Sequence, residues 1–111
     1  MRSAIFHKKA RKVISQFPKE VKRELGKAIF DLQQGNTLGM PLSRPMPDVS
    51  LGVDELRIRD DKGIYRTFYY KKSVRGILIL HAFTKKTQKT PWNEIAITRK
   101  YLKEMLNEEK K

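Results

Sequence analysis

Apolar residues recur at helical spacing in the first third of the chain. Between residues 3 and 17 they lie four, three and four positions apart, which places them on one face of a helix. The pattern resumes after Pro18 and runs to Gly35, and these residue types suit the first position and the end of a helix. The pattern therefore predicts two antiparallel helices joined at Phe17 and Pro18.

The middle of the chain changes to patterns that are typical of strands. Residues 36–52 hold three of the five prolines, which indicates an irregular connection. Runs of alternating or continuous apolar residues then cover residues 53–60, 64–70 and 77–83. Because the turns between them are short, we expect an antiparallel sheet of about three to four strands.

A last helix is expected to start at Thr90 and Pro91, as N-cap and first helical residue. Its apolar stripe is Trp92, Ile95, Leu102 and Leu106. Two helices, a sheet and a C-terminal helix predict a single α+β domain over residues 1–111.

The charge balance points to a polyanionic partner. The chain carries 25 Lys and Arg against 12 Asp and Glu, a net charge of +13. Such an excess opposes folding by self-repulsion, so a counterpart of opposite charge is expected. Nucleic acid is the first candidate and an acidic protein the second, and the two are compatible.

Several classes of site have no support in the sequence. There is no cysteine, and two histidines by themselves do not make a zinc site. Acidic residues do not cluster as metal ligands would, and Asp60 and Asp61 are explained by a turn. We expect no metal and no cofactor. No apolar stretch suits a membrane span or a signal peptide, so a cytoplasmic protein without a membrane partner is expected.

One stretch brings lysines to the start of the last helix. Lys85, Lys86 and Lys89 follow the most apolar strand and precede the helix that opens at Thr90. Free N–H groups and the helix dipole favour an anion at such an end. The stretch therefore predicts a phosphate site.

Arginines on the neighbouring strands can join this site. Arg57 and Arg59 alternate on the polar face of one strand, and Arg66 lies in the middle of the next. In a meander they can converge with the lysines on one face near one end of the sheet. A cross-strand partner such as Glu55 is the structural alternative. Arg66, among aromatic residues, needs a partner or an anion.

Aromatic and histidine side chains leave two interpretations open. Stacking on unpaired RNA bases and packing in the core both suit the aromatic candidates, Tyr65, Tyr69, Phe83 and Trp92. His81 is expected to be buried and hydrogen-bonded, with acid–base chemistry as the alternative. His7 is expected to be exposed on the first helix.

The chain resembles a known family in a set of ordered motifs. These are Glu55-Leu56-Arg57, Tyr65-Arg66, the run from Leu80 to Pro91, and Glu94-Ile95. Together they look like the RelE/HigB toxins of type II toxin–antitoxin systems, in the branch of phage-derived host-inhibition proteins. The resemblance spans essentially the whole chain. It implies a RelE-like fold, ribosome-dependent cleavage of messenger RNA without a metal, and a cognate antitoxin that is a small helix-turn-helix protein.

The resemblance also implies roles for individual residues. The catalytic set would be Arg57, Arg66, Lys85 and Lys86, and the RNA-binding set would be Arg59, Tyr65, Phe83 and Lys89. The cations would stabilise the phosphoryl oxygens while the RNA 2′-OH attacks. A lysine of the pair would be the general base, because neighbouring cations favour its neutral form. Many relatives use a C-terminal tyrosine or histidine, whereas this chain has its last helix there, with Tyr101 inside it.

Two other functions remain open at this point. ParE-type toxins share the fold but inhibit DNA gyrase, usually without a cluster of basic and proton-transfer groups in the cleft. A basic RNA-binding module without activity is the other alternative. The run from Lys85 to Lys89 and Arg66 favour the nuclease.

Overall fold

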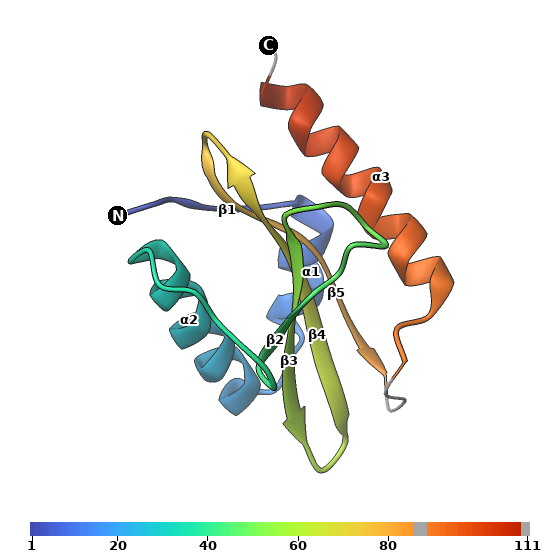
Figure 1. Cartoon of the computed structure of the whole chain (residues 1–111). Coiled ribbons are helices and arrows are strands. Elements are labelled where there is room, and N and C mark those ends of the chain that lie inside the picture. The colour runs from blue at the N-terminus through green and yellow to red at the C-terminus, as the bar shows by residue number, and fades with distance from the viewer. Residues whose placement is uncertain (86–88, 110–111) are drawn as a thin grey trace.

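The computed structural model describes residues 1–85 and 89–109 (Figure 1). The helices are α1 (Lys8–Ser15), α2 (Lys19–Gln33) and α3 (Trp92–Glu109). The strands are β1 (Ala4–Phe6), β2 (Ser43–Pro45), β3 (Val53–Asp60), β4 (Gly63–Ser73) and β5 (Gly76–Lys85). The predicted α+β class is confirmed. Lys86 lies outside the described residues.

The sheet is larger than predicted and is mixed rather than antiparallel. Its strand order over the described residues is β1-β5-β4-β3-β2. The three long strands form the predicted antiparallel meander, while β1 runs parallel to β5 and β2 antiparallel to β3. Each added strand has three residues, too few for an alternating pattern to emerge. Their backbones become strands by pairing with a neighbouring long strand.

The prediction of a helix from residue 3 was wrong at its start. Ala4 to Phe6 pair with Ile77 to Ile79, and α1 begins only at Lys8. A strand therefore precedes the two helices, so the element order differs from the prediction. The predicted helical stripe included Phe6, because an apolar residue before a helix cannot be told by spacing from one inside it.

Helices cover both faces of the sheet (Figure 1). On one face α1 and α2 share a core with Leu56, Ile58 and Tyr65. On the other face α3 packs over Phe68 and its neighbours, with part of the segment between β2 and β3. Because side chains alternate along each strand, every long strand contributes to both cores. Among the described residues, no helix has the length and apolarity that a membrane span requires.

Candidate functional site

The strand register brings the predicted basic residues to one face of the sheet. Arg57 lies opposite Arg66, which lies opposite Phe83. Two register positions nearer the β3–β4 turn, Arg59 and Lys85 flank Ile64 on either side. Residues two apart on a strand share a face, so both rows lie on the α3 side of the sheet. These rows are called the basic rows below.

Next to the basic rows on the same face of β3, Glu55 is the centre of a buried ion cluster that includes Arg57 and Arg66. Its Oε1 lies 3.1 Å from Arg66 Nη1, 3.1 Å from Arg44 Nε and 3.7 Å from Arg57 Nε. Glu55 and Arg66 are fully buried, and Arg44 is partly exposed. The alternative of a cross-strand glutamate partner for the arginines is therefore realised. Sequence reasoning did not foresee Arg44 here.

The cluster holds more positive than negative charge. Three guanidinium groups surround one carboxylate. Burial lowers the pKa of Arg57 from its ordinary value, and the charges of Arg44 and Arg66 lower it further. A burial penalty and like charges both disfavour the cation. An anion bound at Arg57 would offset the repulsion among the three arginines, so the cluster favours anionic ligands.

Thr90 ties the start of α3 to this cluster. Its hydroxyl donates to Glu55 Oε2 at 2.9 Å and accepts from Arg44 Nη2 at 3.1 Å and Arg66 Nη1 at 3.5 Å. The sequence predicted Thr90 only as an N-cap. The sequence hinted at a contact between Glu55 and Arg57, because the two alternate on one strand face. No local pattern connected either residue with Thr90, which is far away in the sequence.

The predicted catalytic and basic residues differ in how much of their surface is exposed to solvent. Arg66 is fully buried at 0% exposure, so it can position its neighbours but is closed to solvent. Arg57 keeps 9% of its side chain exposed, whereas Arg59, Lys85 and Lys89 are exposed. The accessible cations therefore form the surface of the site, and Arg66 lies beneath it.

The two aromatic residues of the predicted RNA-binding set lie in the core. Tyr65 is on the opposite face, buried, with its ring 5.1 Å from Phe17 in an edge contact. Phe83 is on the α3 face but buried, 5.7 Å from Phe68 and 5.4 Å from His81. Both rings therefore pack in the core, which was the alternative to stacking on RNA bases.

Trp92 and Tyr69 complete the set of aromatic candidates. Tyr69 is fully buried on the α2 side, where burial raises the pKa of its phenol to about 12. Trp92 was expected in the apolar stripe of the last helix, yet its side chain is 63% exposed. It is the first residue of α3, and the helix residues in the core on this face are Ile95, Leu102 and Met105.

Both histidines contact a glutamate of α3. His81 is buried and its Nε2 lies 2.9 Å from Glu94 Oε1, as the expectation of a buried, hydrogen-bonded histidine requires. His7 is also buried, so the expectation of exposure was wrong. It precedes α1 as the N-cap, and its Nδ1 accepts from the Lys9 amide at 3.2 Å. The ring is buried because it packs against α3, where it stacks on Tyr101.

The cap also decides the tautomer of His7. Because Nδ1 accepts a hydrogen bond, Nε2 carries the proton and donates to Glu104 Oε1 at 2.8 Å. That bond lowers the pKa of Glu104. The His7 ring stacks on Tyr101 at 4.0 Å, and Tyr101 meets His81 edge-on at 5.5 Å. Tyr101 therefore packs between the two histidines.

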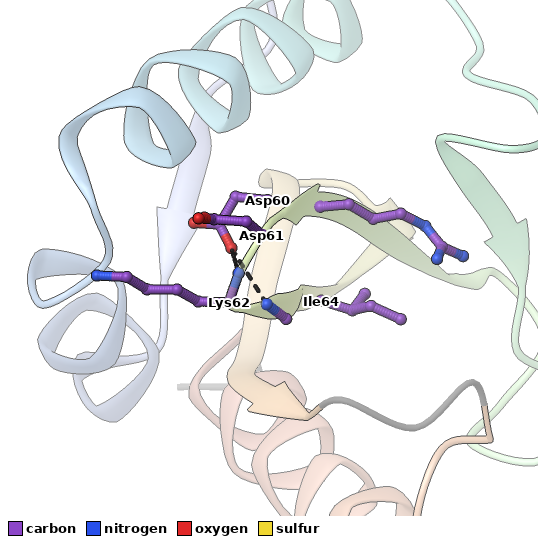
Figure 2. A pocket seen from close by; sticks show the side chains of 6 residues that line it. Asp60, Asp61, Lys62 and Ile64 are labelled. Carbon is purple, nitrogen blue, oxygen red and sulfur yellow. Dashed lines mark hydrogen bonds between the residues drawn. The ribbon is translucent and has the colours of Figure 1, made fainter.

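A hollow of about 300 Å³ at the β3–β4 turn is explained by the turn itself (Figure 2). Asp60 Oδ1 accepts from the amides of Lys62 at 2.8 Å and Gly63 at 3.1 Å. The turn predicted at these residues is confirmed. Across residues 1–85 and 89–109, no three His, Cys, Asp or Glu side chains gather as metal ligands would.

Comparison with known proteins identifies the family. The family model described as "Phage derived protein Gp49-like (DUF891)" matches residues 12–103. The match begins within α1, ends within α3, and includes every residue of the buried ion cluster. No curated protein matches the chain. Because the match covers most of its length, the chain belongs to the Gp49-like family of phage-derived proteins.

Proposed function

We propose that this protein is the toxin of a type II toxin–antitoxin system, of RelE/HigB type, and cleaves messenger RNA on the ribosome without a metal. The observation that carries the proposal is the pair of basic rows, which share Arg57 and Arg66 with a buried cluster of excess positive charge. The Gp49-like family and the sequence resemblance support it. The partners would be the ribosome, its message and a small helix-turn-helix antitoxin in the cytoplasm.

The chemistry needs only groups that this chain supplies. The RNA 2′-oxygen attacks the adjacent phosphorus while the bond from phosphorus to the 5′-oxygen breaks, leaving a cyclic phosphate and a 5′-hydroxyl. Arg57 would stabilise the phosphoryl oxygens, the effect that usually dominates in such reactions. One of Lys85 and Lys86 would accept the 2′-hydroxyl proton, and the other, in its protonated form, would give a proton to the leaving 5′-oxygen. Glu55, which also pairs with Arg66, would position Arg57.

The test is primer extension on cellular messages after brief expression of wild type, Arg57→Ala and Arg75→Ala. Arg75 is an exposed arginine in the turn between β4 and β5, at the other end of the sheet. We expect discrete cuts within translated codons for wild type and Arg75→Ala. Cutting by Arg57→Ala should fall about 100-fold, the typical effect of removing one charge-stabilising donor. Cleavage on purified ribosomes should persist in a chelator.

Other outcomes would replace the proposal. Intact messages with arrested replication would favour inhibition of DNA gyrase. Binding to RNA without cuts would indicate a non-catalytic RNA-binding module. Equal cutting by both variants would remove Arg57 from the catalytic set.

A further inference from the structure

A groove of about 370 Å³ lies beside the buried ion cluster, between the end of β2 and the start of α3. Apolar residues, among them Met46 and Ile95, form part of its wall. Arg44, Lys89 and Trp92 also line it. Arg44 belongs to the groove and to the Glu55 cluster at once. The groove is therefore continuous with the proposed catalytic face.

Trp92 forms an exposed aromatic platform at this groove. Its side chain is largely exposed, and the guanidinium of Arg99 lies 5.0 Å from its ring centroid. Arg99 is itself held, because its Nε donates to the Asp48 carbonyl at 2.7 Å and its Nη2 donates to the same oxygen. A cation fixed over one face of an indole holds the orientation of the ring. Because Trp92 is still 63% exposed, part of the ring surface stays open to a ligand. The platform is thus ordered before any ligand binds.

The groove suits a ligand that carries negative charge for its cations and a flat, apolar part for Trp92. Arg44 and Lys89 bring two cations to the groove and Asp48 brings one carboxylate, so positive charge is in excess there. A nucleotide offers the matching pair of groups, since its phosphate suits the cations and its base stacks on an aromatic ring. An acidic protein segment would satisfy the cations but would leave the indole platform without a role.

We propose that this groove binds one unpaired base of single-stranded RNA, stacked on Trp92, with the adjoining phosphate at Arg44 and Lys89. This inference deepens the proposed function and rests on it: the base would belong to a nucleotide that flanks the cleaved bond. The bound base would help to set which messages, and which positions in them, are cut.

Because Trp92 is the single tryptophan, its fluorescence reports on the groove directly. The probe is a 2′-O-methyl RNA hexamer, which has no 2′-hydroxyl and stays uncut. We expect the hexamer to quench Trp92 emission. In fluorescence polarisation with a labelled hexamer, Trp92→Leu should bind about 10-fold more weakly, as loss of one stacked base predicts. Trp92→Phe, which keeps a ring, should retain most of the affinity.

Two controls separate stacking from charge and from misfolding. Phe30→Leu removes another exposed aromatic side chain, from α2 on the opposite side of the sheet, and should bind as wild type does. A hexamer of abasic sugar phosphates keeps the charges without the rings, and should bind without quenching Trp92.

Three results would overturn the inference. These are equal affinity of wild type and Trp92→Leu, equal quenching by the abasic hexamer, and equal quenching by a polyglutamate peptide, which would mark a site for acidic protein. If the proposed nuclease function is wrong, messages stay uncut in primer extension while the hexamer still quenches Trp92. If messages are cut but Trp92→Leu binds the hexamer as tightly as wild type, only the base-binding groove is ruled out.

Discussion

Glu55 is the carboxylate around which three arginines of the site gather. Its carboxylate is fully buried and faces Arg44, Arg57 and Arg66 within 3.7 Å. Taking such charges out of water is costly, and the cost is offset only while the opposite charges remain together. Removing the carboxylate would leave the arginines facing one another in a buried setting.

We therefore expect Glu55→Gln to lower the free energy of unfolding by about 3 to 5 kcal/mol, the usual effect of breaking a buried ion pair from one side. Urea unfolding measures this change. Glu20→Gln is the matched control, because Glu20 pairs with Arg23 on the exposed surface of α2, and it should change stability little. Equal unfolding midpoints for the two variants would show that the cluster is not a stability determinant.

Among the elements, β1 depends on a close approach that a single glycine permits. The Ile77 amide donates to the Ser3 carbonyl at 2.8 Å, beside Gly76. A β-carbon built on Gly76 would lie 2.3 Å from that carbonyl oxygen, and Gly76 has φ +142°. Any other residue must therefore displace the backbone before β1 and adopt a strained conformation.

Gly76→Ala should destabilise the protein by about 1 to 3 kcal/mol, from backbone strain and weakened β1 pairing. Gly26→Ala is the matched control on α2, where an added β-carbon meets no atom within 4 Å. It should instead stabilise by about 0.5 to 1 kcal/mol, because alanine is the better helix former. Parallel urea unfolding compares the two, and changes of the same sign would contradict the proposed crowding at Gly76.

At the scale of the molecule, excess positive charge and its distribution govern nucleic-acid binding. The net charge is +13, and exposed cations occur on α1 and α2 as well as at the basic rows. Attraction to any polyanion is therefore expected from the whole surface. Binding at a specific site differs from this general attraction. There, particular cations contact individual phosphates and release the counterions of those phosphates.

Salt dependence separates the two contributions. The logarithm of the association constant for single-stranded RNA should fall with the logarithm of salt concentration by about 0.7 per phosphate contacted. Arg59→Ala combined with Lys85→Ala should make the slope shallower by about 1.4, which is two such contacts. Lys22→Ala with Lys27→Ala, two exposed lysines of α2, should leave it nearly unchanged. An equal change in both double variants would mean that net charge alone drives binding.

Predictions from the sequence were accurate where the signal is local. The helix after Pro18, the three long strands and the turn at Asp60 follow from spacing and turn chemistry within a few residues, and the structure confirms them. They failed where a neighbour distant in sequence decides. Ala4 to Phe6 become a strand only by pairing with β5, and His7 is buried only because α3 lies against it.

Local patterns suffice to predict the α+β class, the long elements and the basic character of one sheet face, because periodicity and charge are properties of short segments. The burial of Arg66, the three arginines around Glu55 and the exposure of Trp92 beside them depend instead on how the elements pack together. Glu55 joins Arg44 from β2, Arg66 from β4 and Thr90 before α3. Contacts among four separate segments depend on strand register and helix docking, and no local pattern specifies these.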